Sequence, residues 1–280
     1  KKSLIKKGFE SCFQKSNKSK YLIVSYTGNK KAFLQQVQIY ATIQYPSISK
    51  FVGFNNDKKN QYIILDSMAK GTLENYINST HEKLDETRKL IISYGTARAL
   101  EYLHKHNIVH RNVQPSNIYL DLDLFPYLSD FYMAKPIEKK LPYNLKQTTI
   151  EYMAPEFIEN YLLNQDSFKL DVYSFGMTLY FLITETKPFA SYCIDSEGKE
   201  ELRNDILNGK RPEFPKSIPK EWKKLIKNCW KQDQSKRPDF TQICRTLESF
   251  QFASNRINSK IFTFYKDEYL NDQKLEARID

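Results

Sequence analysis

The spacing of apolar residues divides the chain into a strand-rich first part and a helical remainder. Short apolar runs at residues 21–26 and 62–65 predict two β-strands. Between these runs, apolar residues at helical spacing predict one helix, and Pro46 lies beyond its end. The helix positions are Phe33, Val37, Tyr40 and Ala41. The first part is therefore predicted to form a small sheet with one helix.

Beyond Leu73 the apolar residues recur with the period of amphipathic helices. The first helical stripe comprises Leu90, Ile91, Tyr94, Ala97, Leu100 and Leu103. The second comprises Trp222, Leu225, Ile226, Cys229 and Trp230. The third comprises Phe240, Ile243, Cys244, Leu247 and Phe250. Helices are therefore predicted to dominate the rest of the chain.

Residues 172–183 form the longest apolar run, and they predict a buried helix. Ser174, Gly176 and Thr178 interrupt the run, which is also shorter than the ~20 residues that a membrane-spanning helix needs. We therefore predict no transmembrane segment. Residues 251–280 lose the helical periodicity and carry mixed charge, so we expect them to form a C-terminal extension.

The composition indicates a globular, intracellular chain. With 280 residues, of which 40% are hydrophobic and 14% aromatic, the chain can bury a sizeable core. Its four cysteines lie far apart, without the spacing of a disulfide framework or a zinc site, so we expect a reducing, cytoplasmic setting. The chain begins at Lys1 without Met, so we expect an excised domain, and any targeting sequence upstream would lie outside it.

The net charge of +10 is unevenly distributed, because residues 1–31 hold many lysines and a single acid, Glu10. This pattern fits either a basic face for an acidic partner or anionic lipid, or a compositional bias on solvated loops. Because arginines and periodic clustering are absent from this segment, we favour the second interpretation. We do not predict nucleic-acid binding.

Five short motifs follow one another in a defined order. Residues 110–117 read His-Arg-Asn-Val-Gln-Pro-Ser-Asn, residues 129–132 Ser-Asp-Phe-Tyr, residues 153–156 Met-Ala-Pro-Glu, residues 171–176 Asp-Val-Tyr-Ser-Phe-Gly, and residues 236–238 Lys-Arg-Pro. In this order they are similar to motifs that run from the catalytic loop to the C-terminal end of protein kinases. Over about residues 4–250, the sequence therefore resembles the protein kinase superfamily, in its tyrosine-kinase-like branch.

The resemblance implies an α+β, bilobal kinase-like fold. Its small β-rich lobe with one main helix would cover residues 1–68, and its larger, mainly helical lobe residues 69–250. Leu65 would lie at the gatekeeper position of the hinge, with Asp66 and Met68 next to a bound nucleotide. Residues 251–280 would follow as the extension.

The resemblance also implies which residues should hold the phosphates of ATP. Kinases use a Gly-rich loop, a strand lysine paired with a helix glutamate, and Mg²⁺ ions. The Gly-rich loop aligns with residues 5–13 and keeps only Gly8. The lysine position falls at Val24, or at Ser25 if the register slips by one, and the glutamate position falls at Gln36. The phosphate clamp is therefore expected to be lost on both sides.

Five aligned positions lie at the chemistry itself or next to it. Asn112 stands where the family has its proton-accepting Asp, and an amide cannot take a proton at neutral pH. Gln114 replaces the lysine that steadies the transferred phosphate. Asn117 and Asp130 match the metal ligands, so weak binding of ATP with Mg²⁺ stays open. Tyr132, in place of the glycine of D-F-G, implies a stiffer loop.

The residues that hold the kinase framework are retained, in contrast to those at the chemistry. They are His110 and Phe131 of the regulatory spine, Asp171 of the catalytic-loop anchor, and Glu156 with Arg237 of an ion pair in the larger lobe. Two further histidines, His104 and His106, are interpreted as the exposed end of a helix. The resemblance thus implies that the scaffold is kept while phosphate handling is lost.

Three hypotheses follow. The first is a pseudokinase that binds or allosterically regulates another protein, such as a kinase or signalling partner, without transferring phosphate. The alternative is an active Ser/Thr protein kinase with an atypical site, in which Lys6, Lys7 or Lys15 reaches the phosphates. The third is a surviving nucleotide pocket that senses a ligand without transfer. A phosphate-transfer assay would separate the first hypothesis from the second.

Overall fold

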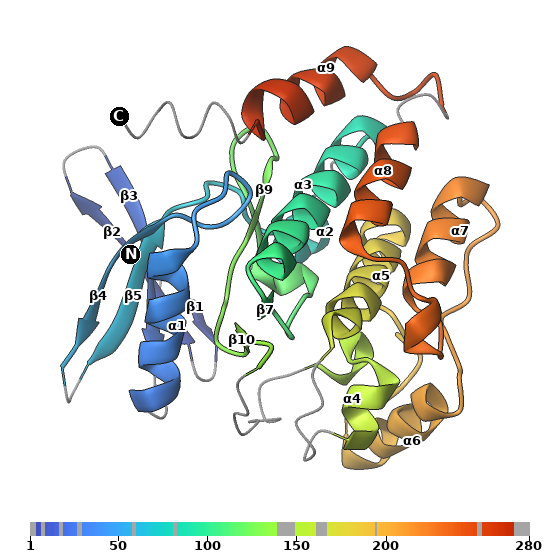
Figure 1. Ribbon diagram of the computed structural model, residues 1–280, viewed down its shortest axis with the longest axis horizontal. Coiled ribbons are helices and arrows are strands. Elements are labelled where there is room, and N and C mark those ends of the chain that lie inside the picture. Colours follow the sequence, from blue (N-terminus) through green and yellow to red (C-terminus); the bar gives the residue numbers. More distant parts are fainter. Residues whose placement is uncertain are drawn as a thin grey trace.

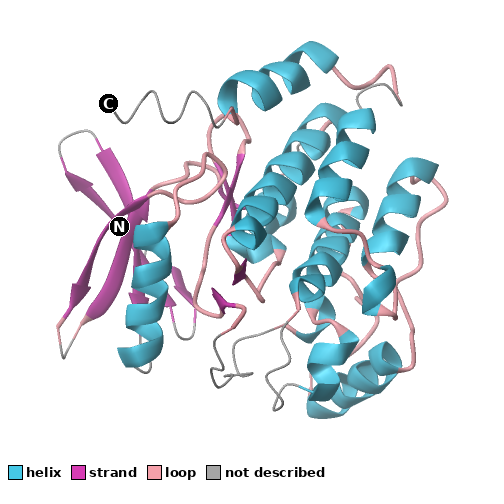
Figure 2. Cartoon of the chain, in the orientation of Figure 1, coloured by secondary structure: helices cyan, strands magenta, loops and turns pink. Residues whose placement is uncertain are grey.

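A β-rich part and a helical part lie side by side in the structure, joined by an extended stretch after β5 (Figure 1, Figure 2). We call them the small lobe and the large lobe. The computed structural model describes residues 4–6, 9–16, 19–26, 30–57, 60–80, 83–138, 149–160, 167–193, 195–250 and 254–271, with side chains from residue 21 onward except Asn160. The predicted α+β class is confirmed.

The small lobe is an antiparallel sheet with one helix packed against it. Its elements are β1 (Leu4–Lys6), β2 (Phe9–Ser16), β3 (Ser19–Tyr26), α1 (Lys30–Thr42), β4 (Phe51–Asn56) and β5 (Gln61–Asp66). In the described part of the chain, the strands follow the order β1-β2-β3-β5-β4. The strands predicted at residues 21–26 and 62–65 and the helix predicted between them are confirmed.

Strand β3 lies in the middle of this sheet, and alternate side chains on it face the core. Leu22 and Tyr26 are buried, and Val24 between them is partly buried. This alternation reflects the two-residue period of a strand. Val24 lies opposite Ser11 of β2 and Ile63 of β5.

The large lobe contains the remaining elements. They are β6 (Gly71–Thr72), α2 (Leu73–Ser79), α3 (Glu86–Lys105), β7 (Ile108–Val109), β8 (Ile118–Leu120), β9 (Pro126–Leu128), β10 (Lys135–Pro136), α4 (Pro155–Asn160), α5 (Phe168–Thr184), α6 (Ser196–Leu207), α7 (Lys220–Cys229), α8 (Phe240–Phe250) and α9 (Ser259–Phe264). The stripes predicted for α3, α7 and α8 face the core, as expected.

Helix α5 lies at the centre of the large lobe, and every residue from Leu170 to Ile183 is buried. Its start is capped by Ser167, whose hydroxyl accepts a hydrogen bond from the backbone of Lys169. The prediction of a buried helix at residues 172–183 is therefore confirmed. No helix in the described ranges is both long and apolar enough to span a bilayer.

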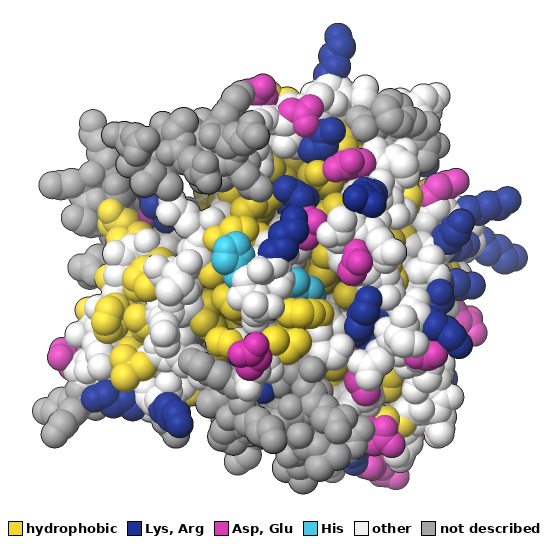
Figure 3. Space-filling view, in the orientation of Figure 1, with side chains coloured by type: hydrophobic (Ala, Val, Ile, Leu, Met, Phe, Trp, Pro, Cys, Tyr) yellow, Lys and Arg dark blue, Asp and Glu magenta, His cyan; other side chains and the backbone are white. Residues whose placement is uncertain are grey.

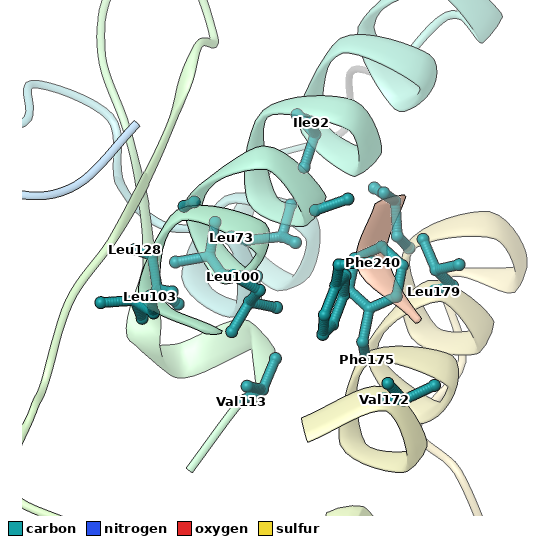
Figure 4. Packing of buried hydrophobic residues seen from close by; sticks show 14 of the residues in the cluster. Leu73, Ile92, Leu100, Leu103, Val113, Leu128, Val172, Phe175, Leu179 and Phe240 are labelled. Carbon is teal, nitrogen blue, oxygen red and sulfur yellow. The ribbon is translucent and has the colours of Figure 1, made fainter. Parts of the chain in front are cut away.

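Aromatic side chains join α5 to the neighbouring helices. Phe175 of α5 and Phe240 of α8 pack edge to face, with ring centroids 5.4 Å apart. Figure 4 shows these two rings facing Leu100 and Ile92 of α3. All four side chains are at most 2% exposed, so the core that supports the catalytic loop is closely packed.

The C-terminal segment packs on the large lobe. Helix α9 continues into a π-helical turn, Tyr265–Tyr269, and together they lie along the outside of α3 (Figure 1). Phe262 and Tyr265 are fully buried, and the hydroxyl of Tyr265 is 2.8 Å from that of Ser47, in the loop after α1. This short helix was not predicted from the sequence, and it ties the large lobe to the small one. The division into a domain of 250 residues and a separate extension stays a prediction.

Candidate catalytic and nucleotide site

The loop at residues 110–117 is held from below by one buried carboxylate. Asp171, in the first turn of α5, accepts hydrogen bonds from the backbone N–H groups of His110 and Arg111, at 2.8 and 2.7 Å. Burial raises the pKa of Asp171, but the hydrogen bond to His104 and the nearby backbone and imidazole groups outweigh it, and the pKa lies below its ordinary value. The predicted role of Asp171 as the anchor of this loop is confirmed by these contacts.

His104 corrects one prediction from the sequence. It was interpreted as an exposed helix end, but its Nε2 lies 2.9 Å from Oδ2 of Asp171 and only 13% of its side chain is exposed. Its ring also packs between Phe168 and Phe240. His104 is therefore part of the loop anchor, whereas His106 is exposed as expected.

A column of four rings runs from the small lobe to the same loop. Phe51 of β4 stacks on Tyr40 of α1, with ring centroids 6.0 Å apart. Tyr40 meets Phe131 edge to face at 4.7 Å, and Phe131 meets His110 at 5.1 Å. Tyr40 also accepts a hydrogen bond from the backbone N–H of Asp130 at 3.1 Å. The column therefore fixes α1 relative to the loop that carries Asp130.

His110 has no free nitrogen with which to act as a base. Its Nε2 lies 3.0 Å from the carbonyl oxygen of Ser129, and its Nδ1 accepts a hydrogen bond from the backbone N–H of Asn112. Burial lowers the pKa of His110, which favours the neutral ring that these contacts require. The interpretation of His110 as a packing residue agrees with this geometry.

The predicted catalytic positions form a chain of hydrogen bonds among themselves. The side-chain amide of Gln114 donates to Oδ1 of Asn112 at 3.0 Å. The amide of Asn112 in turn donates to Oδ2 of Asp130 at 3.0 Å. Asn112 and Gln114 are at most 8% exposed. A neutral amide therefore occupies one oxygen of the carboxylate that would otherwise face a cation.

The electrostatics of Asp130 reflect this arrangement. Burial raises the pKa of Asp130 to about 6, although the backbone N–H of Tyr132 and the amide of Asn112 each donate to its carboxylate and lower the pKa. Asp130 also adopts a left-handed backbone conformation with φ of 63°. Such a conformation persists only where surrounding contacts hold it, as Tyr40 and Asn112 do here.

The two residues that hold Mg²⁺ in the kinase reaction, the D-F-G Asp and the catalytic-loop Asn, have counterparts in Asp130 and Asn117, but an amide N–H occupies one oxygen of Asp130. Asn117 uses its NH₂ group to donate to the backbone carbonyl of Asn112 at 2.8 Å, which leaves its Oδ1 as a second oxygen ligand. Divalent cations bind several oxygens, and an N–H donor beside a ligating carboxylate opposes them. The described residues hold no cluster of three or more His, Cys, Asp or Glu that could hold a metal ion. A metal ion at this site would therefore depend on further oxygens from the nucleotide that is bound with it.

The positions of the phosphate clamp are filled by uncharged side chains. Val24 lies on β3, and Gln36 is 4% exposed on α1. Two residues beyond Val24 on the same face of β3, Tyr26 packs on Phe33 of α1 and on Tyr132, with ring centroids 5.4 and 5.5 Å apart. Burial and a hydrogen bond with Tyr132 raise the pKa of Tyr26, so its hydroxyl is neutral at physiological pH. Tyr26 and Tyr132 therefore connect the small lobe to the Asp130 loop through a contact between neutral side chains.

The predicted nucleotide-binding residues of the hinge lie at the end of β5. Leu65 is 1% exposed and lies opposite Leu22 of β3. Asp66 is the last residue of the strand, and the carbonyl of Met68 accepts a hydrogen bond from Gly71 at 3.2 Å. The Gly8 position lies outside the described residues, and of the basic N-terminal segment only backbone is described before residue 21.

The comparisons with known proteins agree with this arrangement. The family model for protein tyrosine and serine/threonine kinases matches residues 17–247. The chain belongs to this kinase family. The resemblance stated from the motifs and the bilobal fold that it implied are therefore confirmed.

Curated relatives of this kinase domain are considerably longer proteins. A protein kinase and PP2C-like domain-containing protein of Arabidopsis thaliana is 28% identical over 257 residues, which cover 81% of this chain and 39% of that protein. A probable serine/threonine-protein kinase of Dictyostelium discoideum is 30% identical over 77% of this chain and 16% of that protein. The probable serine/threonine-protein kinase SIS8 of Arabidopsis thaliana is 30% identical over 83% and 22%. The chain thus spans less than half the length of each of these relatives.

A second framework contact of the kinase domain lies away from the catalytic loop. Arg237 donates to both oxygens of Glu156, at 2.6 and 2.8 Å, and its guanidinium lies over the ring of Tyr173. The Arg237 side chain is fully buried, and it also donates to the carbonyl of Lys169. The ion pair expected from the resemblance is therefore present.

Three residues of the kinase site were missed in the sequence. Tyr40 lies four residues beyond Gln36, and this spacing places the two on one face of α1. Tyr26 lies two residues beyond Val24, on the same face of β3. Gln35 donates to the carbonyl of Ala134 at 2.9 Å and adds a third link between α1 and the Asp130 loop. The first two positions could have been identified from periodicity.

Proposed function

We propose that this chain is a pseudokinase domain: a kinase fold held together by its own side chains, which acts by binding or regulating another protein. The observation that carries the proposal is the hydrogen bond from Asn112 to Asp130. At the place where a kinase needs a proton acceptor, this chain has an amide that donates to the metal-binding carboxylate. General-base help contributes about 10²–10⁴ in rate.

The remaining groups at the site support the same proposal. The strand lysine is replaced by Val24 and its glutamate partner by Gln36, while Gln114 replaces the second lysine. Phosphoryl transfer consists largely of positioning and charge stabilisation, so each loss removes a part of catalysis. Because Tyr40 and Gln35 of α1 bond directly to the Asp130 loop, α1 and this loop need no nucleotide to stay together.

A phosphate-transfer assay tests the proposal directly. The purified domain is incubated with radiolabelled ATP and Mg²⁺ or Mn²⁺, with a basic protein as the acceptor and the Asp130→Ala variant as the control. We expect no incorporation above that of the control. Incorporation that disappears in Asp130→Ala would show an active enzyme and overturn the proposal.

The second candidate is an active Ser/Thr kinase with an atypical site, and the names of two relatives as probable serine/threonine-protein kinases favour it. A positive charge on the phosphates would then have to come from Lys6, Lys7 or Lys15, whose side chains lie outside the described ones. If the assay shows transfer, the variants Lys6→Ala, Lys7→Ala and Lys15→Ala identify the residue, because only the lysine that reaches the phosphates should lower the rate strongly.

Nucleotide binding without transfer is a separate outcome. A ligand present at about 100 times its Kd adds about 2.7 kcal/mol to the free energy of unfolding. We expect at most a small thermal shift at millimolar ATP with Mg²⁺. A large shift that is lost when bulk is added at the gatekeeper, in Leu65→Trp, would instead indicate a sensing pocket. A cytoplasmic location stays a prediction.

A further inference from the structure

A groove on the large lobe lies well away from the catalytic loop. It is open to solvent, has a volume of about 700 Å³, and runs between residues 209–214 and the face of α7 with the residues that follow this helix. We call it the α7 groove. Its described lining contains four basic side chains and one acidic one, Glu213.

The floor of the α7 groove is aromatic and rigid. Phe214 and Trp230 pack with ring centroids 5.2 Å apart, and Tyr180 of α5 lies behind both, at 5.6 and 6.0 Å. The hydroxyl of Tyr180 donates to the carbonyl of Glu213 at 3.0 Å, which holds this segment in place. Trp230 is only 4% exposed, so the floor presents ring edges and Phe214 more than an open stacking surface.

Arg211 joins the two walls of the groove. Its Nε donates to the carbonyl of Trp230 at 3.0 Å and its Nη2 to Oε1 of Gln232 at 2.6 Å. The guanidinium also lies 5.0 Å from the ring centroid of Tyr173. These contacts fix the shape of the groove before any ligand arrives, which lowers the entropic cost of binding.

Three lysines form a row along the rim. Lys223 and Lys227 are four residues apart and share one face of α7, and Lys231 follows the end of the helix in the same lining. Like charges at this spacing destabilise a helix. None of the three forms an ion pair with a carboxylate in the described part of the chain, whereas Lys210 nearby pairs with Asp205 at 2.7 Å. Figure 3 shows Lys and Arg side chains projecting at the edge of the molecule where α7 lies in Figure 1.

We propose that the α7 groove binds an acidic peptide segment of a partner protein. A large apolar side chain of the peptide would lie on Phe214 against the aromatic floor, and flanking carboxylates would meet the rim formed by Lys223, Lys227 and Lys231. The charge of the lining is complementary to such a segment, and the apolar floor supplies an anchor. The groove is concave, which suits a peptide better than a flat membrane, and the burial of Trp230 disfavours the base stacking that single-stranded nucleic acid uses.

The proposal does not depend on the loss of phosphate transfer, because no residue of the α7 groove belongs to the catalytic loop. An active kinase could use the same groove to hold its substrate or regulator. Failure of the pseudokinase proposal in the phosphate-transfer assay would therefore leave the groove proposal intact. Failure of the groove proposal in the peptide-binding assay would likewise leave the pseudokinase proposal intact.

Fluorescence polarisation with a defined probe tests the groove. The probe is a fluorescein-labelled peptide, Asp-Glu-Asp-Phe-Asp-Glu-Asp, and the two control peptides have Ala for Phe or Lys for every acid. We expect saturable binding of the probe, binding that is at least about fivefold weaker with Ala for Phe, and no binding of the basic peptide.

Matched charge reversals locate the binding. The double variant Lys227→Glu with Lys231→Glu changes the rim, whereas Lys220→Glu with Lys224→Glu changes two exposed lysines of α7 outside the lining by the same net charge. We expect the rim variant to weaken binding about tenfold or more and the control variant less than about threefold. The neutral pair Lys227→Gln with Lys231→Gln serves as a second rim variant if charge reversal disturbs the fold.

Four results would overturn the proposal. The first is no binding of the probe at millimolar protein, and the second is equal weakening of binding by the rim and control variants. The third is equal affinity for the probe and for the peptide with Ala in place of Phe. The fourth is rim-dependent binding of phosphatidylserine vesicles or of a single-stranded oligonucleotide without rim-dependent binding of the probe. Rim-dependent binding of the acidic aromatic probe alone supports the proposal.

Discussion

The ring column and the phosphate-handling positions lie next to each other, and they differ in how their residues are paired. In the column, His110, Phe131 and Tyr40 make the contacts that a kinase framework needs. At the phosphate-handling positions, charged groups are replaced by a valine and by amides, and two of these amides bond to each other and to Asp130. The second region is therefore rebuilt around new contacts between uncharged side chains and Asp130.

This difference has a physical reason. A kinase holds two carboxylates near each other and relies on metal ions and phosphates to offset their repulsion. In this chain, Asn112 replaces one carboxylate, and the contact with Asp130 becomes attractive without a cation. A buried group that loses its partner costs more than a pair that is replaced together. The paired loss of the strand lysine and helix glutamate at Val24 and Gln36 follows the same rule.

The largest effect is expected from the framework, at the ion pair between Glu156 and Arg237. Glu156→Ala leaves a fully buried guanidinium without its carboxylate, and we expect the free energy of unfolding to fall by about 3–5 kcal/mol. Urea denaturation measures this change. The matched control is Glu200→Ala, which removes a carboxylate that is 61% exposed beside Arg203 and should cost less than about 1 kcal/mol. Equal costs for the two variants would contradict the contrast between the regions.

The next effect concerns the contact that ties the C-terminal segment to the lobes. A Cβ at Gly95 would collide with the hydroxyl of Tyr265 and would lie 2.6 Å from Cγ of Pro126 and 3.0 Å from Oγ of Ser47. We expect Gly95→Ala to lower the free energy of unfolding by about 2 kcal/mol. In a Tyr265→Phe background the same substitution should cost less, because the closest atom is gone. A double-mutant cycle from urea denaturation measures the coupling energy between positions 95 and 265. Additive changes in the free energy of unfolding would show that the Tyr265 hydroxyl does not fill the space beside Gly95.

A smaller effect is expected where the catalytic Asp is restored. Asn112→Asp places a carboxylate against Asp130 in place of the amide donor, and we expect a loss of about 1.5 kcal/mol at pH 7.5. Added Mg²⁺ should recover part of this loss in thermal unfolding. The control Asn112→Ala removes the donor without adding a second carboxylate, so its stability should respond to Mg²⁺ less than that of Asn112→Asp. Restored phosphate transfer is not expected, because Val24 and Gln114 remain.

The fold could be predicted largely from the apolar pattern, because β3, β5, α1, α3, α7 and α8 each bury a regular apolar face and α5 is a long apolar run that is buried all round. Helix α9 was missed for a physical reason. It has only six residues, and Phe262 and the adjoining Tyr265 are buried because Gly95, far away in the sequence, leaves space for the tyrosine hydroxyl. No local sequence pattern reveals that Gly95 leaves this space.

The candidate site was predicted in part. The motif order located Asn112 and Asp130, but not the hydrogen bond between their side chains, because two amide orientations are equally compatible with the sequence. His104 was misjudged because its partner, Asp171, lies 67 residues further along the chain. The contact between Tyr26 and Tyr132 likewise joins two lobes. Residue type and local spacing locate positions, whereas these pairings arise only from the tertiary fold.

The smallest effect tests the state of Asp130 by its pH dependence. The pKa of Asp130 is raised by burial from an ordinary 3.8 to about 6 in the folded chain, so the folded state binds the proton more tightly than the unfolded state. The contribution of Asp130 to the free energy of unfolding is therefore highest below about pH 4, and it falls as the pH rises to about 6. We expect this loss to be about 1 kcal/mol, because Asp130 is only partly buried.

Asp130→Asn isolates this contribution, because its amide cannot titrate. The measurement is the difference in urea unfolding free energy between the parent and this variant at pH 4.5 and 7.0, with the exposed Asp123→Asn as the control. The parent should lose stability relative to Asp130→Asn as the pH rises, whereas Asp123→Asn should show no such trend. A gain by the parent instead would mean that a cation faces Asp130, and the phosphate-handling region would then resemble that of an active kinase.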